Sequence, residues 1–264
     1  MKVLVTGATG YIGAVAADAL AATGHEVLGL ARSTRSANAL RGRGIEPAMG
    51  DFGDPASLAT AITESRPDVV VSAASVGASS GDNATTFARD REAVRAMREA
   101  LADHGGALVF TSGSAVFGSF NGGDATDAVY SEDTPLPLPE SVYAPAAAGV
   151  HPLLVAGFGA SMAARVETEQ AVLADGNGRG VVVRPGLVYG RGGNSDLTAL
   201  IDRARAAGVA PDTGGVAAPS RATYTSRTWL SSTAWLWITR RTGRSCMASS
   251  RTSASANWRW RSTG

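Results

Sequence analysis

Three glycines at fixed spacing follow the first apolar run of this chain, and they limit its fold more than any other feature. The stretch VLVTGATGYIGAVAADAL contains Gly7, Gly10 and Gly13 between a predicted strand and a predicted helix. Gly7 allows a tight turn, Gly10 lets the backbone approach a pyrophosphate, and Gly13 allows close helix packing. The N-terminus of the helix stabilises phosphate charge. This pattern predicts a dinucleotide site at the opening of a βαβ unit.

Short β-rich runs alternate with longer helical patterns up to about residue 207, which is typical of βαβ units around a parallel sheet. The candidate strands are Lys2–Thr6, Glu26–Ala31, Asp68–Ser72, Ala107–Ser112 and Gly180–Arg184. The candidate helices are Tyr11–Thr23, Pro55–Glu64, Thr85–Asp103, Ser161–Ala174 and Ser195–Ala207. We therefore predict an α/β fold with a Rossmann-type doubly wound parallel sheet. We expect residues 1–208 to form its NAD(P)-binding domain and residues 209–264 to be an aberrant basic tail, in which the substrate subdomain is incomplete or disordered.

Four motifs resemble, in their order along the chain, those of the short-chain dehydrogenase/reductase superfamily. They are TGxxGxxG, then GDFGD at 50–54, TSGSAVFG at 111–118 and RPGLVYGRG at 184–192. The chain is similar to the extended or atypical members, which are NAD-dependent epimerases and dehydratases. The resemblance implies that Asp51 and Phe52 contact adenine. It extends the cofactor site to Ala8, Thr9, Tyr11, Ile12, Ala73, Ala74, Pro185 and Val188.

The end of the second strand indicates which cofactor is bound. An NAD-selective site has Asp or Glu there to accept a hydrogen bond from the ribose 2′-OH. The sequence HEVLGLARSTRS has Ala31 at that position, followed by Arg32 and, nearby, Arg35. Because a planar guanidinium suits a 2′-phosphate, we predict NADP in preference to NAD. The alternative is that Arg32 is a solvated arginine in an ordinary loop.

The tyrosine and lysine that serve catalysis in this superfamily are absent as a pair. Family enzymes use a tyrosine whose pKa is lowered by a lysine four residues later, so that the phenol exchanges a proton near neutral pH. The only lysine of the chain is Lys2, which rules out a Tyr-x-x-x-Lys motif. Matching Glu169 to the glutamate that follows the family's lysine puts Ser161 at the tyrosine position and Arg165 at the lysine position. Arg165 is therefore a candidate to hold a ribose hydroxyl.

The family's catalytic hydroxyl, on the fifth strand, also lacks a direct counterpart. Its position falls on Gly113, between Ser112 and Ser114, and both serines are candidate proton donors. Tyr130 and Tyr143, in the proline-rich stretch that follows, are alternatives. The plainer interpretation of these tyrosines is that they cover apolar surface.

Because the family's catalytic tyrosine, lysine and hydroxyl are not all present, two classes of function remain open. The first is an atypical NAD(P)-dependent reductase, epimerase or dehydratase that acts on a small carbonyl, alcohol or sugar-nucleotide substrate. The second is a nucleotide-binding protein of the redox-sensor kind, without hydride transfer. Motifs that face a nicotinamide, TSGSAVFG and RPGLVYG, favour the enzyme.

The last 50 or so residues differ in composition from the rest of the chain. All 23 acidic residues lie at or before Asp212, whereas 8 of the 24 basic residues follow it.

Extended family members carry a segment like WSxVHVxDLAxLYxLAL here. When the last base of each codon is read with the first two of the next, the chain from Ala222 allows NVHVEDLA, and Ala234–Ile238 allows LALD. We therefore predict a change of reading frame between about Val209 and Ala222 and a poorly packed tail. A nucleic-acid arm or a membrane segment is disfavoured, since the tail has no basic face at helical spacing.

Composition sets a few further expectations. No signal peptide and no apolar stretch of about 18 residues occurs, which predicts a soluble cytoplasmic protein. The single cysteine, Cys246, and the three histidines disfavour a metal enzyme. The resemblance also implies a homodimer, through the helices predicted at Thr85–Asp103 and Ser161–Ala174.

Overall fold

The computed structural model describes residues 1–76, 83–117, 136, 152–174, 179–190, 201–202, 205–206, 223–225 and 246–247. Its strands are β1 (Lys2–Thr6), β2 (Glu26–Ala31), β3 (Glu46–Met49), β4 (Val69–Ser72), β5 (Ala107–Thr111), β6 (Arg179–Arg184), β7 (Leu187–Tyr189), β8 (Thr223–Thr225) and β9 (Cys246–Met247). Its helices are α1 (Tyr11–Ala22), α2 (Thr34–Arg41), α3 (Pro55–Ser65), α4 (Asn83–Ala102), the 3₁₀ turn η1 (Ser114–Phe117) and α6 (Pro152–Leu173).

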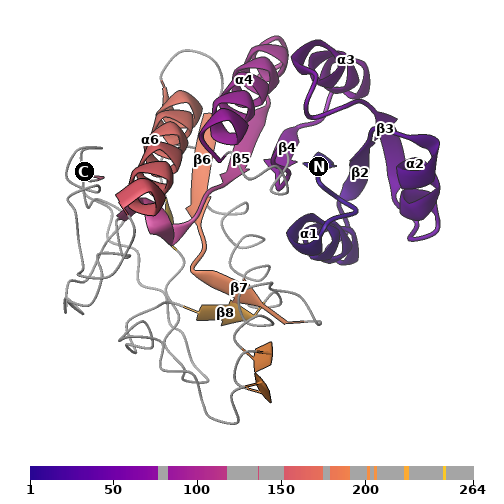
Figure 1. Cartoon of the computed structure of the whole chain (residues 1–264). Helices are drawn as coiled ribbons and strands as arrows, with labels where there is room; N and C mark the ends of the chain where they lie inside the picture. The colour runs from indigo at the N-terminus through magenta and orange to yellow at the C-terminus, as the bar shows by residue number, and fades with distance from the viewer. Residues whose placement is uncertain are drawn as a thin grey trace, which may run out of the picture.

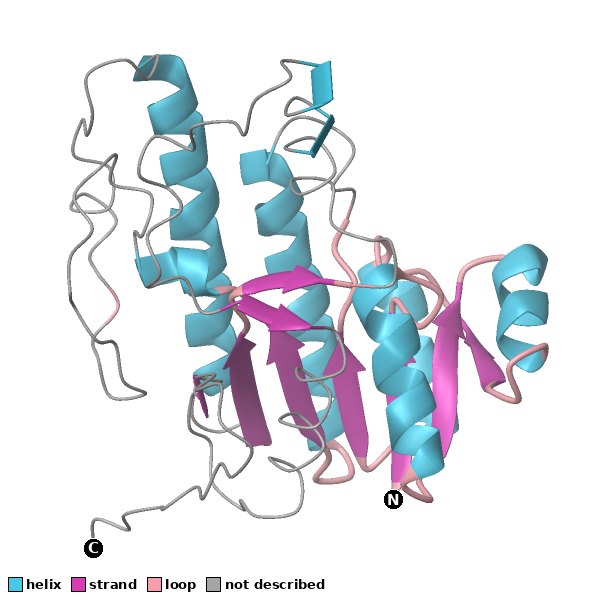
Figure 2. Ribbon diagram, turned by 90° about the horizontal axis from the view of Figure 1, so that it is seen from below, coloured by secondary structure: helices cyan, strands magenta, loops and turns pink. Residues whose placement is uncertain are grey.

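Parallel strands form a seven-stranded sheet in the order β3-β2-β1-β4-β5-β6-β9. Strand order reverses at β1, where β2 and β3 lie on one side and β4, β5 and β6 on the other, as in a doubly wound sheet. This confirms the predicted Rossmann-type α/β fold. A second, two-stranded sheet of β7 and β8 crosses beyond the ends of the main strands (Figure 2).

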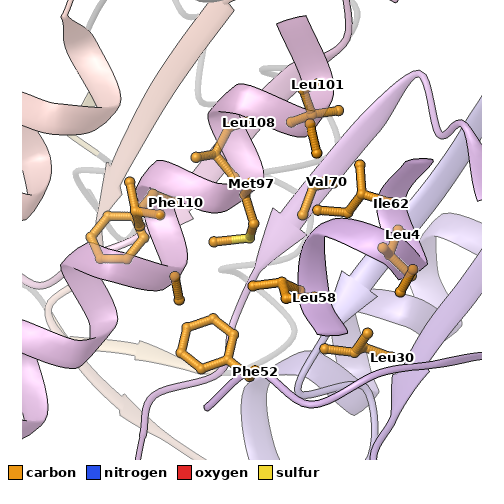
Figure 3. Packing of buried hydrophobic residues seen from close by; sticks show 14 of the residues in the cluster. Leu4, Leu30, Phe52, Leu58, Ile62, Val70, Met97, Leu101, Leu108 and Phe110 are labelled. Carbon is orange, nitrogen blue, oxygen red and sulfur yellow. The ribbon is translucent and has the colours of Figure 1, made fainter. Parts of the chain in front are cut away.

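Helices cover both faces of the main sheet (Figure 1). On one face, side chains of α1 and α2 such as Val15 and Leu40 pack against Val3, Val5 and Val27. On the other face, α3, α4 and α6 cover alternate residues of the same strands. There Leu4, Leu30, Val70, Leu108 and Phe110 meet Leu58, Ile62, Met97 and Leu101 (Figure 3). Because the central strands are buried on both faces, their sequences are nearly continuous apolar runs.

Several elements of the structure differ from the sequence prediction, among them α2, β3 and the start of α6. Neither α2 nor β3 is among the predicted elements, because TRSANALR buries only Ala37 and Leu40, and EPAM is an edge strand with a proline. Helix α6 begins at Pro152, nine residues before the predicted start at Ser161. Its first turns contain Gly157 and Gly159, which disfavour a helix by propensity. Of the predicted helix Ser195–Ala207, only residues 201–202 and 205–206 are described, and they are helical.

Two of the short strands belong to the stretch for which the sequence predicts poor packing. Strand β8 pairs with β7, and β9 pairs with the last two residues of β6. Most of 209–264 lies outside the described residues.

Candidate functional site

The glycine loop joins β1 to α1 in a conformation that side chains would obstruct. Gly7 has a φ of +67°, and a Cβ there would lie 2.8 Å from the carbonyl oxygen of Ala73. A Cβ on Gly13 would overlap the carbonyl of Gly7. The Gly10 N–H donates to the Gly7 carbonyl at 2.7 Å and closes the turn. Gly7 and Gly13 therefore have steric reasons that agree with the sequence prediction of a tight turn and close helix packing.

The loop leaves the start of α1 open for an anion. Gly10 is the N-cap of α1 and has no side chain to accept from the first N–H groups of the helix, whose first turn carries no acidic residue. Unsatisfied N–H groups at a helix N-terminus favour a phosphate. The backbone cradle and this helix end fit a dinucleotide pyrophosphate.

Thr6 fixes the glycine loop to the neighbouring strand. Its Oγ1 accepts hydrogen bonds from the N–H groups of Ala73 and Ala74, both at 3.2 Å. Ala73 and Ala74 follow β4 directly, so two segments predicted to contact the cofactor lie side by side.

The end of β2 carries a cation and no carboxylate. Ala31 is buried, Arg32 is exposed, and Ser33 starts α2 as the N-cap of a capping box with Ser36. The Ser33 hydroxyl accepts from the Ser36 N–H at 3.2 Å. The residue after β2 that meets solvent is therefore an arginine.

Asp51 and Phe52, predicted to contact adenine, both have roles within the fold. The Asp51 carboxylate accepts from the Gly53 N–H at 2.9 Å, and the Asp51 N–H donates to the Ser57 hydroxyl at 3.2 Å. Phe52 is buried in the core cluster (Figure 3). The partly buried Val76 also packs against that cluster. The carboxylate shapes the turn that leads into α3.

The candidates Ser112 and Arg165 lie together at the carboxyl end of β5. Arg165 donates through Nε to the Ser112 hydroxyl and through Nη2 to the Thr111 carbonyl, both at 3.2 Å. The Ser112 hydroxyl donates to Glu169. Arg184, at the end of β6, donates twice to the other Glu169 oxygen, at 2.9 and 2.7 Å. Since the Ser112 hydroxyl already donates its hydrogen bond to the buried Glu169 carboxylate, it is poorly placed to donate a proton to a substrate.

Asp90 extends this polar network to the loop after β4. The Asp90 carboxylate accepts from the Ser75 hydroxyl at 2.6 Å and from the Val76 N–H at 2.7 Å. Burial raises the pKa of Asp90, while the two hydrogen bonds and the nearby Arg165 charge lower it in part. Burial likewise lowers the pKa of Arg165, and the charges of Asp90 and Glu169 oppose this shift. The Arg165 charge thus stabilises the Asp90 carboxylate, and both carboxylates stabilise the Arg165 guanidinium.

Ser114 lies apart from that network, in η1. Its N–H donates to the Pro185 carbonyl at 2.9 Å, and its side chain is half-buried. Ser161 belongs to α6, but its side chain lies outside the described residues, as do Tyr130 and Tyr143. Of the three proposed catalytic side chains, the structure brings Ser112 and Arg165 into contact and places Ser114 at the next turn of the same loop.

Tyr11 connects the glycine loop to the segment after β6. Its hydroxyl donates to the Gly190 carbonyl at 2.8 Å, across 179 positions of sequence. A tyrosine phenol is protonated and able to donate near neutral pH, and burial raises the pKa of Tyr11 further. This contact brings the start of α1 to the end of β7, which carries the predicted site residue Val188 and follows the buried Pro185.

Sequence reasoning did not identify Asp90 as a member of the site. It occurs in the helical stretch FARDREAV among other charged residues, and helical periodicity alone does not single out one charged side chain as buried.

Within the described part of the chain, no group of three or more His, Cys, Asp or Glu residues is arranged to hold a metal ion. None of the helices described there has the length and apolar character needed to cross a bilayer.

Comparison with known proteins adds to this geometry. The model of the NAD dependent epimerase/dehydratase family matches residues 3–214. The chain belongs to this family.

Two curated relatives match part of this epimerase/dehydratase chain. A dTDP-4-dehydrorhamnose reductase of Burkholderia thailandensis is 36% identical over 120 residues, or 44% of this chain. An uncharacterised protein of Saccharomyces cerevisiae is 35% identical over 122 residues, or 43% of this chain. The matched segments span only 35% and 38% of those two proteins.

Solved structures of enzymes in complex with NAD share the fold of this family member. The UDP-glucose 4-epimerase of Thermus thermophilus, in complex with NAD, superposes with a TM-score of 0.62 at 23% identity, over 93% of this chain and 76% of that enzyme. The Bordetella bronchiseptica enzyme WbmG, also in complex with NAD, gives a TM-score of 0.63 at 20% identity, over 94% and 72% of the two chains. At these identities the likeness supports the fold alone.

Proposed function

We propose that this epimerase/dehydratase family member binds NADP in preference to NAD. The observation that carries the proposal is the exposed Arg32, which follows the buried Ala31 at the end of β2. The acidic side chain that would accept from a ribose 2′-OH is missing there, and a guanidinium suits a 2′-phosphate. The open N-terminus of α1 supports a pyrophosphate at Gly7–Gly13.

We further propose that the protein is an atypical oxidoreductase, epimerase or dehydratase for a small carbonyl, alcohol or sugar-nucleotide substrate. When bound, the nicotinamide cofactor supplies or accepts a hydride. Ser112 donates to Glu169, so Ser114 is the better candidate to donate a proton or hydrogen bond to a substrate oxygen. Arg165 holds Ser112 and the Thr111 carbonyl and keeps the end of β5 in place.

A second candidate function is a non-catalytic NADP-binding sensor. One observation favours it: Ser112 and Arg165, which occupy or adjoin the family's catalytic positions, are hydrogen-bonded to each other, and Ser112 also donates to the buried Glu169. Titration of the wild-type protein with NADPH, followed by incubation with a panel of carbonyl substrates, separates the two functions. Sustained oxidation of NADPH supports the enzyme. Tight binding without turnover on any substrate supports the sensor.

The cofactor assignment is tested by replacing Arg32 with alanine. Loss of one charge-assisted contact to a phosphate costs about 1.5–3 kcal/mol, so Arg32→Ala is expected to weaken NADPH binding about tenfold or more. NADH has no 2′-phosphate, and its dissociation constant is expected to stay nearly unchanged. Isothermal titration of both cofactors measures this, and equal losses for the two would contradict the assignment.

A further inference from the structure

Arg43, in the loop after α2, reaches back to the glycine loop. Its Nη1 donates to the Ala8 carbonyl at 2.7 Å. Its Nη2 donates to the Ala14 carbonyl at 2.6 Å and to the Asp18 carboxylate at 2.5 Å. One guanidinium thus joins the middle of the glycine loop to the first turns of α1.

The Ala8 contact bears on a group that faces away from Arg43. The carbonyl of Ala8 and the N–H of Thr9 belong to one planar trans peptide, so they point in opposite directions. A cation that holds the carbonyl on one side therefore directs the Thr9 N–H to the other side. Thr9 is exposed and lies within the turn that Gly7 and Gly10 close.

Arg43 is suited to this task by its shape and its charge partner. The planar fork of a guanidinium presents several donors in fixed directions, so one side chain bonds two carbonyls and a carboxylate at once. Asp18 balances the charge at a surface where the Arg43 side chain is 29% exposed and the Asp18 side chain 47%. Both terminal nitrogens of this guanidinium thus donate to groups of the protein, and Arg32 is exposed at the end of β2.

We propose that Arg43 is a positioning residue for the cofactor, which orients the Thr9 peptide of the glycine loop toward the phosphates of the bound dinucleotide. The inference rests on the proposed dinucleotide site at Gly7–Gly13. It differs from the role of Arg32 because the pyrophosphate is common to NAD and NADP. Arg43 therefore serves both cofactors, whereas Arg32 serves NADP.

The test compares Arg43→Ala with a matched control, Arg41→Ala. Arg41 lies two residues earlier in the chain and donates to Asn38 within α2, without touching the glycine loop. Isothermal titration with NADPH and with NADH is carried out at a temperature where circular dichroism shows each variant folded. Arg43→Ala is expected to weaken both cofactors about tenfold, with their ratio unchanged, and Arg41→Ala is expected to match the wild type.

Two further measurements separate positioning from loss of stability. The amide resonance of Thr9 is expected to move in Arg43→Ala before any cofactor is added, and to stay in place in Arg41→Ala. If Arg43→Ala does not fold, Asp18→Asn replaces it. That variant keeps the carbonyl bonds but loses the charge partner, and it is expected to weaken both cofactors by about two- to threefold at an unchanged ratio.

Unchanged affinity for both cofactors in a folded Arg43→Ala variant would overturn the proposal. Loss of NADPH affinity alone would also overturn it, because Arg43 would then act on the 2′-phosphate. If the wild-type protein bound neither cofactor, the proposed function itself would fail, and this inference with it. Normal wild-type binding with an unaffected Arg43→Ala variant would remove the inference and leave the proposed function standing.

Discussion

At the scale of single residues, Asp90 links pH to stability. Burial raises its pKa above the ordinary 3.8, so the folded protein binds this proton more tightly than the unfolded chain does. The resulting stability is complete below the unfolded pKa and is lost as pH rises through the folded pKa. We expect the free energy of unfolding of the wild type, relative to Asp90→Asn, to fall as pH rises above about 4 and then to level off. Urea denaturation of both proteins from acidic to neutral pH measures this. If the free energy of unfolding of the wild type instead rose relative to that of Asp90→Asn as pH increased, the role of burial would be contradicted.

Some residues of the candidate site could be predicted from the sequence, and others could not. The glycines were predictable because Gly7 and Gly13 meet steric demands that no other residue satisfies, and a spacing pattern records such demands. The exposed cation at Arg32 was predictable from its place after an apolar strand. Asp90 and Arg43 were not, because their roles depend on which distant backbone group each one meets. Those partners, Val76 and Ala8, lie 14 and 35 positions away in sequence.

At the scale of elements, two glycines where the glycine loop joins α1 are expected to serve different purposes: Gly13 stabilises the fold, and Gly10 serves cofactor binding. A Cβ on Gly13 would overlap the backbone of Gly7, which has no way to yield, so Gly13→Ala is expected to lower the free energy of unfolding by about 1–3 kcal/mol. A Cβ on Gly10 would lie 3.1 Å from the same carbonyl oxygen, a milder contact. Gly10→Ala is therefore expected to cost less stability while weakening cofactor binding. Urea denaturation without cofactor, followed by NADPH titration, measures both effects; equal loss of stability in the two variants would refute the distinction.

Elements differ in how well the sequence predicts them. Strands β1, β4 and β5 were predicted because burial on both faces requires unbroken apolar runs. The edge strand β3 carries no such run, since only Ala48 of its four residues is buried and one of the others is a proline. Its pairing with β2 is fixed by the fold and not by its own four residues.

At the scale of the whole molecule, the family match ends at residue 214. This end falls inside the interval from Val209 to Ala222 in which the codon pattern predicts a change of reading frame. The nucleotide sequence across codons 205–225 tests that prediction directly. A single frame that continues through these codons in independent isolates of the gene would contradict it.

The proposed division into a cofactor domain and a tail makes a second prediction at this scale. A chain that ends at Asp212 is expected to bind NADPH within about threefold of the full chain. The glycine loop and the end of β2 lie within residues 1–76, whereas the described tail strands β8 and β9 pair with β7 and β6. Titration of the shortened chain, once circular dichroism shows it folded, provides the measurement. Loss of binding in a folded shortened chain would assign the tail a part in the cofactor site.

The central position of β1 in the sheet also bears on how the protein folds while it is being made. β1 is synthesised before the other strands of this sheet, so its partner β2 has a strand to pair with once residues 26–31 have emerged from the ribosome. β3 then extends the sheet beside β2, and β4, β5 and β6 extend it one after another on the opposite side. Each new strand meets a partner that is already present, so none of these six strands waits for a later segment. Domains that assemble in the order of synthesis expose little unpaired strand edge at any one time, which limits aggregation on the way to the native state.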